Sequence, residues 1–174
     1  MINSYLLVEP SRSYSEQLQQ FIQAFSEEPF IHGSSAITSF DKIADWLTAI
    51  ESYKNAETCP EQFVPAEQYI YINENKDVLG ILNLRKQLND YLFAYGGHIG
   101  YSIHPAYQGQ GLATQMLKEA LQKAKAFHID RVLITCSDTN IGSARVIEKN
   151  GGILENIVLD PNDGEMTRRY WINL

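Results

Sequence analysis

The sequence predicts an α/β (α+β) fold with a mixed, mostly antiparallel central sheet of six or seven strands flanked by about four helices. Three observations lead to this prediction. The 174 residues fit a single domain, 1–174. With 44% hydrophobic and 11% aromatic residues, the chain can bury a substantial core. Short β-rich runs alternate with segments of helical spacing, and the strongest helical segment lies between two strands.

The first third of the chain is predicted to be mainly helical. A β-rich run at 4–9 precedes a helix over about 14–26, where apolar residues recur at steps of three and four. A second helix is expected at about 41–54, with Asp41 as its N-terminal cap. Residues 57–67 contain two prolines and scattered acidic side chains, so we expect a long connecting loop there.

The rest of the chain is predicted to be richer in strands. The expected elements, in order, are strands at 69–72 and 78–84, a short helix at 88–95, a strand at 98–103, a long helix at 111–127, a strand at 131–136, a helix at 141–149, and strands at 153–159 and 165–173. The strand, helix and strand between 98 and 136 predict a parallel crossover, with the helix packed on the sheet. The last two strands are expected to form a hairpin.

Charge and cysteine content exclude several classes of protein. The net charge is −7, and no stripe of cations suggests nucleic-acid binding. All of this charge lies in residues 1–67, which hold ten acidic and three basic side chains. Cys59 and Cys136 are too far apart to suggest a zinc site or a disulfide framework. No signal peptide or membrane-length apolar run is seen, so a cytoplasmic protein that binds neither membrane nor metal is expected.

The most informative segment is Ile-Gly-Tyr-Ser-Ile-His-Pro-Ala-Tyr-Gln-Gly-Gln-Gly-Leu-Ala-Thr-Gln-Met at 99–116. It contains a strand, a proline stop, a Gly-x-Gly turn at Gly109 and Gly111, and the start of the long helix. Glycine allows backbone angles that other residues resist and lets a ligand approach the main chain. The first turn of a helix carries unpaired N–H groups and partial positive charge. The segment therefore predicts a site for a phosphate-like anion.

Known phosphate-binding patterns fit this turn unequally. The nucleoside-triphosphate pattern fails because Leu112, and not a lysine, follows Gly111. The dinucleotide pattern fits badly because Thr114 stands where a third glycine is needed. A third pattern, Gln/Arg-x-x-Gly-x-Gly/Ala, is met by Gln108, Gly111 and Ala113.

Through this third pattern the chain resembles the GNAT superfamily of N-acetyltransferases, in which the loop cradles the pyrophosphate of coenzyme A. The Ser-Ile-His-Pro segment at 102–105 and the stretch from Asn140 to Gly152 resemble other family segments. The likeness covers residues from about 67 to 174, and the order of elements agrees with the family fold over the whole chain. The runs at 96–101, 132–136 and 168–171 look like a branch of predicted bacterial acetyltransferases.

The resemblance implies a set of cofactor-binding residues. The pyrophosphate of acetyl-CoA would bind the amides of residues 108–114, and the pantetheine would pair with the backbone of Ile103 and with the side chain of Asn140, one helical turn before Ser143. The implied cofactor-binding residues are Ile103, Gln108, Gly109, Gln110, Gly111, Leu112, Ala113, Thr114, Asn140 and Ser143. A purely structural role remains open, with the glycines building a turn and Asn140 capping a helix.

The catalytic residues are less clear. Where the family often has a tyrosine acid, this chain has Ile147, and Gly97 stands at the position of a family carboxylate. The candidates that remain are Tyr101, which shares a strand face with Gly97, and His98, which points the other way unless a glycine bulges the strand. Cys136 is expected to be a small core residue.

The resemblance implies transfer of the acetyl group of acetyl-CoA directly to a primary amine of a small molecule or peptide. Asn83 and Arg85 alternate along a strand and could face that substrate, and the acidic first third with the loop at 57–67 is expected to form a rim that favours a cationic amine. One alternative is a non-catalytic acyl-CoA-binding or regulatory module on the same fold, and a weaker one is a nucleotide-binding protein. Exposed strand edges at the terminal hairpin would permit a homodimer.

Overall fold

Residues 4–174 are described by the computed structural model, and they form two antiparallel sheets. The first sheet has the order β1-β2-β3-β4, and the second has the order β5-β7-β6. The strands are β1 (Leu6–Val8), β2 (Ala66–Ile72), β3 (Val78–Arg85), β4 (Ile99–Ile103), β5 (Arg131–Ser137), β6 (Ile153–Leu159) and β7 (Met166–Asn173). The predicted fold class is confirmed, with its seven strands divided into groups of four and three.

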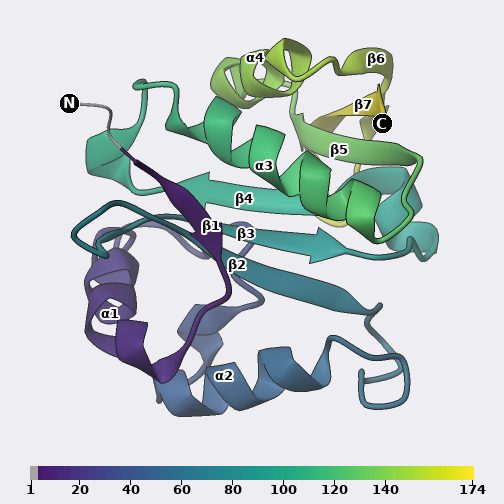
Figure 1. The fold of residues 1–174 in the computed structure, drawn as a ribbon. Coiled ribbons are helices and arrows are strands. Elements are labelled where there is room, and N and C mark those ends of the chain that lie inside the picture. Colours follow the sequence, from purple (N-terminus) through teal and green to yellow (C-terminus); the bar gives the residue numbers. More distant parts are fainter. Residues whose placement is uncertain (1–3) are drawn as a thin grey trace.

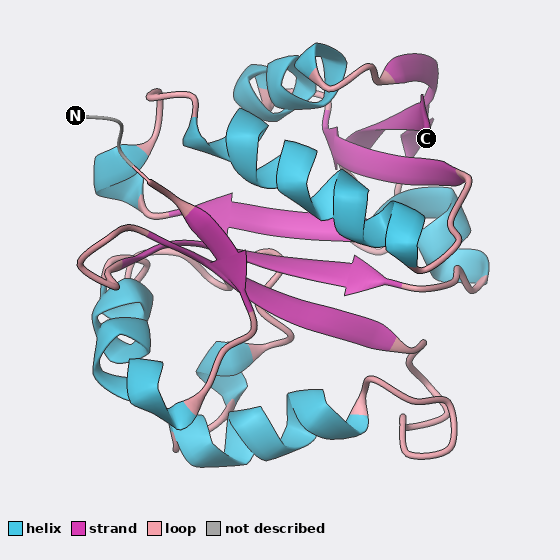
Figure 2. Cartoon of the chain, viewed as in Figure 1, coloured by secondary structure: helices cyan, strands magenta, loops and turns pink. Residues whose placement is uncertain are grey.

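Four α-helices are found among the described residues: α1 (Ser15–Gln23), α2 (Ile43–Ser52), α3 (Leu112–Ala126) and α4 (Ile141–Lys149). Figure 1 shows α1 and α2 together on the lower side of the first sheet and α3 and α4 on the upper side. Figure 2 shows the same layering, with the strands of the first sheet between the two helical layers. The crossover from β4 through α3 brings β5 beside the start of β4.

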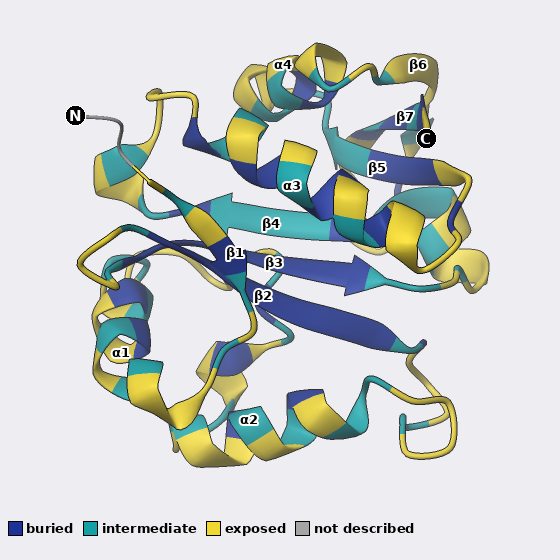
Figure 3. Ribbon diagram, viewed as in Figure 1, coloured by how far each residue is buried: buried dark blue, intermediate teal, exposed yellow. Residues whose placement is uncertain are grey.

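Two apolar cores form because the inner strands are covered on both faces. Along β2, Tyr69 and Tyr71 belong to the core beneath α3, whereas Ile70 and Ile72 belong to the core against α1 and α2. This alternation follows from the two-residue repeat of a strand. Figure 3 shows β2 and β3 as buried over nearly their whole length. No described helix is both long and apolar enough to cross a membrane.

Three local predictions differ from the structure. The loop predicted at 57–67 ends earlier, because β2 already begins at Ala66. The segment predicted as a short helix at 88–95 contains a single π-helical turn over Leu92–Gly96. Lys42, and not Asp41, is the residue before α2, and no side chain caps that helix. The shifts at Ala66 and Lys42 are of one or two residues, the range within which the ends of elements ordinarily vary.

The connection between α1 and α2 is pressed against β4 through two glycines. Gly33 has a φ of +75°, and a Cβ built on it would lie 2.2 Å from the carbonyl oxygen of Gly100. The hydroxyl of Ser102 donates to the carbonyl of His32 (2.8 Å), and the side-chain amide of Gln68 donates to the carbonyl of Gly33 (2.7 Å). These contacts fix the α1–α2 connection, which belongs to the first third of the chain, against β4 and β2.

Replacing Gly33 with alanine is expected to destabilise the fold strongly. The left-handed backbone costs a non-glycine residue about 1–2 kcal/mol, and the clash with Gly100 adds about 1–3 kcal/mol. Gly164→Ala is the matched control, because Gly164 has a φ of +77° and nothing within 4 Å of the added Cβ. Urea denaturation should show the larger loss for Gly33→Ala; equal losses would contradict the close packing.

Candidate functional site

The glycine turn before α3 presents open main-chain groups. Gly109 and Gly111 have φ values of +74° and +81°, and nothing lies within 4 Å of a Cβ built on either. Gly111 is the residue before α3, and no described side chain caps this helix. The first-turn N–H groups, which helical geometry leaves unpaired, are therefore free for a ligand. The side-chain amide of Gln108 donates to the carbonyl of Ile103 (3.1 Å), which ties the turn to the end of β4.

The edge of β4 that faces away from β3 is open over most of its length. The main-chain amide of Arg85 donates to the carbonyl of His98 (2.7 Å), and the main-chain amide of His104 donates to the carbonyl of Leu79 (2.8 Å). These bonds fix the ladder between β3 and β4. In an antiparallel pair with this register, the main-chain groups of Ile99, Tyr101 and Ile103 point away from β3. A strand-like ligand arm can pair with them.

β4 and β5 meet at one junction and then separate. The amide of His98 donates to the carbonyl of Leu133 (2.7 Å), and the amide of Leu133 donates to the Nδ1 atom of the His98 imidazole (2.9 Å). Gly97 has a φ of +68°, and a Cβ there would lie 2.6 Å from the Leu133 carbonyl oxygen. Farther along β5, the Thr135 hydroxyl donates to the carbonyl of Tyr95 (2.7 Å), outside β4.

This junction explains the environment of His98, one of the two catalytic candidates. The residue is 7% exposed. Burial, together with the nearby positive charge of Arg85, lowers the pKa of His98 to about 4. The imidazole is therefore neutral at physiological pH and accepts a hydrogen bond from the main chain. Its contacts are those of a structural residue at the point where the strands part, and they make Tyr101 the stronger catalytic candidate.

A cavity of about 620 Å³ lies where β4 and β5 have separated. Its walls come from the α1–α2 connection, the end of β3, the turn at 92–96, β4, the end of β5, the start of α4 and the β6–β7 connection. Tyr101, Asn140 and Ser143 all line it, so the structure brings these three predicted residues together. Residues 108–114 lie outside the lining, at the other end of β4.

A pair of hydroxyl groups spans the cavity wall between β4 and α4. The Tyr101 hydroxyl lies 3.0 Å from the Ser143 hydroxyl. Burial raises the pKa of Tyr101 to about 12, so its hydroxyl keeps its proton at neutral pH. Next to this pair, the Oδ1 atom of Asn140 accepts from the amide of Ser143 (3.0 Å) and caps α4. Because Oδ1 is used in this way, Asn140 has its amide N–H groups left to offer a ligand.

The acidic side chains of the cavity come from a segment that the sequence analysis did not single out, whereas Arg85, which it did name, also lines the cavity. Asp160, Asp163 and Glu165 of the β6–β7 connection line one side, and no residue of 57–67 lines the cavity. The prediction that this loop forms an acidic rim is therefore wrong, because the loop lies beyond α2. Cys136 also lines the cavity, and burial raises the pKa of its thiol to about 11.

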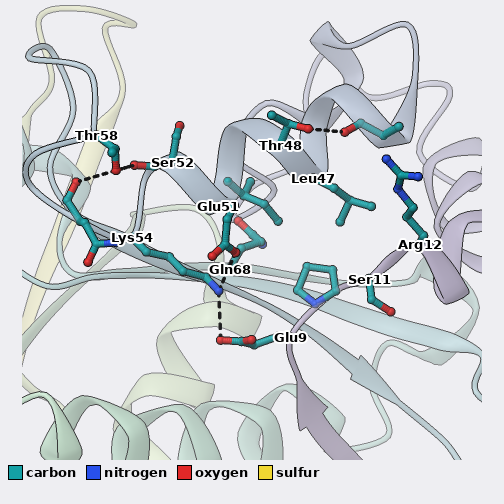
Figure 4. Close-up of a pocket in the computed structure, with 14 residues that line it drawn as sticks. Glu9, Ser11, Arg12, Leu47, Thr48, Glu51, Ser52, Lys54, Thr58 and Gln68 are labelled. Atoms are coloured by element: carbon teal, nitrogen blue, oxygen red, sulfur yellow. Dashed lines mark hydrogen bonds and ion pairs between the residues drawn. The ribbon is translucent and has the colours of Figure 1, made fainter.

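A second hollow, of about 680 Å³, lies between α2 and the end of β1. Figure 4 shows Lys54 reaching toward Glu9 (3.4 Å), and Lys54 also pairs with Glu51 (2.8 Å). None of the predicted cofactor-binding or catalytic residues lines this hollow. Within residues 4–174, no group of three or more His, Cys, Asp or Glu side chains could hold a metal ion.

Comparisons with known proteins agree with this geometry. A family model described as "Acetyltransferase (GNAT) domain" matches residues 12–153. A search of curated protein sequences finds no match. Similar solved structures include the ribosomal-protein-S5-alanine acetyltransferase from Vibrio fischeri, with a TM-score of 0.73, 15% identity, and coverage of 99% of this chain and 97% of that chain.

Two further structures show the same fold. The ribosomal L7/L12 alpha-N-protein acetyltransferase RimL, in complex with coenzyme A, has a TM-score of 0.71 and 18% identity, and the match covers 98% of this chain and 94% of that chain. A chimera of the spermidine N-acetyltransferase SpeG from Vibrio cholerae and hSSAT has a TM-score of 0.66 and 12% identity, with coverage of 97% and 94%.

The His98 junction makes stability depend on pH. The unfolded chain binds a proton at His98 near its ordinary pKa of 6.5, and the folded chain binds it only near pH 4. The unfolded state therefore holds more protons between these pH values. Through His98, the free energy of unfolding of the wild type should fall by about 2 kcal/mol between pH 7.5 and pH 5. In urea denaturation, His98→Gln should be less stable than wild type at pH 7.5, and the gap should narrow at pH 5. A gap that stays constant with pH would contradict the buried neutral imidazole.

Proposed function

The chain belongs to the GNAT family of acetyltransferases, and from this premise we propose that it transfers the acetyl group of acetyl-CoA directly to a primary amine. The observation that carries the proposal is the open edge of β4, which runs from the glycine turn to the cavity that holds Tyr101 and Ser143. This path has an anion site at one end and a pair of proton donors at the other. Those are the features that a thioester donor with a diphosphate needs.

The described residues suit acetyl-CoA in three places. The amides of residues 108–114, with open space over Gly109 and Gly111, suit the pyrophosphate. The outward main-chain groups of Tyr101 and the outward main-chain amide of Ile103 suit the amide-containing pantetheine arm, whereas the Ile103 carbonyl already accepts from the Gln108 side chain. The amide N–H groups of Asn140 suit a carbonyl of the same arm. When bound, acetyl-CoA supplies a thioester whose acyl carbon is open to attack by an amine.

Tyr101 and Ser143 are proposed as the proton donors for the departing thiolate. Both line the cavity, and each hydroxyl can pass a proton to the other across 3.0 Å. Because burial raises the pKa of Tyr101, its hydroxyl is protonated near neutral pH and can donate a hydrogen bond to the sulfur as the thiolate forms. This pair takes the place of the family tyrosine that Ile147 replaces, since Ile147 is buried and apolar.

The acceptor is proposed to be an amine of a small molecule or a peptide. The similar structures include enzymes whose names give ribosomal proteins and spermidine as acceptors, and all of these carry amines.

A homodimer is proposed to form through β6, the outer strand of the second sheet. There Ile153 is 67% exposed, and Leu154, Ile157 and Leu159 are also exposed.

A panel of amines tests the function directly. We expect amine-dependent release of free coenzyme A thiol from acetyl-CoA, together with a thermal shift on adding acetyl-CoA. A thermal shift with no amine-dependent release would instead favour the non-catalytic acyl-CoA-binding module. Protection by NAD or ATP, but not by coenzyme A, would favour a nucleotide-binding protein.

Gly111→Val is expected to weaken coenzyme A binding without unfolding the domain. The added side chain enters open space over the turn and blocks the approach of a ligand to the main chain. We expect the Kd measured by calorimetry to rise by about 10-fold or more, as for the loss of hydrogen bonds to a charged group. Gly164→Val, with a φ of +77° and equally open space, is the control and should leave the Kd unchanged. Unaltered affinity in folded Gly111→Val would contradict the assignment.

Tyr101→Phe and Ser143→Ala are expected to lower kcat for acetyl transfer. Removing a positioned proton donor costs about 10²–10⁴-fold in rate where it acts alone, and less where its partner hydroxyl remains. The double variant should therefore lose more than either single variant, while the Kd for coenzyme A changes little. Tyr14→Phe, outside the cavity, is the control in the thiol-release assay. Full kcat in both single variants and in the double variant would remove these residues from the chemistry.

A further inference from the structure

Arg85 is a cation that lines the cavity at the end of β3. Its Nη1 atom donates to the carbonyls of Gly96 and Gly97, each at 3.2 Å. Its Nη2 atom lies 3.4 Å from the position of a Cβ on Gly100, which lines the same cavity. The guanidinium therefore packs on the face of β4 that carries Gly100, whereas the side chain of Tyr101 leaves the opposite face, and both residues line the cavity at the free edge of the strand.

No carboxylate of residues 4–174 forms an ion pair with Arg85, although other partly buried cations are paired. Lys86 pairs with Glu67 (2.7 Å), and Arg168 pairs with Asp138 (2.6 Å). Removing a charge from water without a counter-charge costs free energy, and a bound anion would offset that cost. Burial lowers the pKa of Arg85, in keeping with a poorly compensated charge.

Two acidic side chains of the cavity have bonding partners other than Arg85. Asp160 accepts from the amide and the side chain of Asn162 (2.9 and 2.8 Å), and Asp163 accepts from the amide of Glu165 (2.8 Å). The positive charge of Arg85 contributes to the lowered pKa values of His32 and His98, and it opposes the rise in the pKa of Tyr91. The cavity thus has a cationic side at Arg85 and an acidic side at the β6–β7 connection.

The hydrogen bonds of Arg85 leave part of its planar group unused. Within the described chain, its side chain donates only through Nη1, and no Arg85 nitrogen is among the buried polar atoms that lack a partner. Nη2 therefore remains accessible. A guanidinium with a free face suits a carboxylate, which accepts two parallel hydrogen bonds from it. A lysine or glutamine could hold the two glycine carbonyls, but neither offers this second face together with a fixed charge.

Resting on the acetyl transfer proposed above, we propose that Arg85 binds the carboxylate of the acceptor, and that the acceptor is an α-amino acid. Because Arg85 and Tyr101 line the same cavity of about 620 Å³, a carboxylate bound by Arg85 and an amine that reacts near Tyr101 can belong to one small molecule. An α-amino acid has its carboxylate on the carbon next to the amine. The acidic side of the cavity attracts the ammonium form before the amine reacts.

The test compares acceptors that differ only at the carboxylate. Each common α-amino acid is assayed with acetyl-CoA against its own carboxamide and its decarboxylated amine. For the best acceptor, we expect kcat/KM at least about 10-fold higher for the amino acid than for the carboxamide. Arg85→Gln should lower kcat/KM for the amino acid by about 10- to 100-fold, mainly through KM, and should leave the carboxamide nearly unchanged.

Two further variants make the test specific. Arg85→Lys keeps the charge and loses the planar fork, so it should retain part of the preference, and it serves if Arg85→Gln does not fold. Arg12→Gln makes the same change at an exposed arginine outside the cavity and should behave as wild type. Retained coenzyme A binding by calorimetry shows that each variant is folded.

The outcomes separate this inference from the proposed function. Equal kcat/KM for amino acid and carboxamide, or equal losses of both in Arg85→Gln, would overturn the carboxylate site while leaving acetyl transfer intact. If no amine is acetylated, calorimetric binding of the amino acids and their carboxamides decides the point. Preferential binding of an amino acid that Arg85→Gln abolishes would support the carboxylate site and count against acetyl transfer, and the absence of any preference would overturn the site.

Discussion

The rest of the site depends on the way in which β4 parts from β5. At the junction, the Nδ1 atom of His98 accepts the hydrogen bond of the Leu133 amide that a main-chain carbonyl would accept in a continuous sheet. Gly97 permits the close approach that this requires. Beyond the junction, β5 bonds to the turn at 92–96 and β4 keeps a free edge. The free edge of β4 and the cavity beside it begin at this point, where the His98 side chain and not a main-chain carbonyl accepts the bond from Leu133.

The cavity is completed by segments that lie far apart in the sequence. The α1–α2 connection is held on β4 by Gly33, Gly100 and the bond from Ser102 to His32. The β6–β7 connection supplies the acidic side, and α4 supplies Asn140 and Ser143. In the proposed function, the second half of the chain forms the path for the donor, and both halves together enclose the acceptor.

The sequence predicts those features whose physical cause is local. The long amphipathic helix α3, the glycine turn and the terminal hairpin each follow from spacing or turn chemistry within a few residues, and they are found close to where they were expected. The bond from Leu133 to His98 joins residues 35 positions apart, so no local pattern shows it. The expectation that the loop at 57–67 forms the acceptor rim rests on analogy with the family, and neither that analogy nor the charge of the loop fixes its place in space. Arg85 could be named as facing a substrate, whereas its lack of an ion-pair partner is visible only in three dimensions.

Arg85 and His98 are coupled, and the coupling joins the acceptor side to the junction. The imidazole of His98 can accept from Leu133 only when Nδ1 is unprotonated, and the positive charge of Arg85 opposes its protonation. Arg85 also holds the carbonyls of Gly96 and Gly97, the residues that lead into the junction. Arg85 thus connects the cavity to the junction through these two carbonyls and through its charge. A bound carboxylate would offset the charge that His98 feels, but His98 remains neutral because burial is the larger cause of its low pKa.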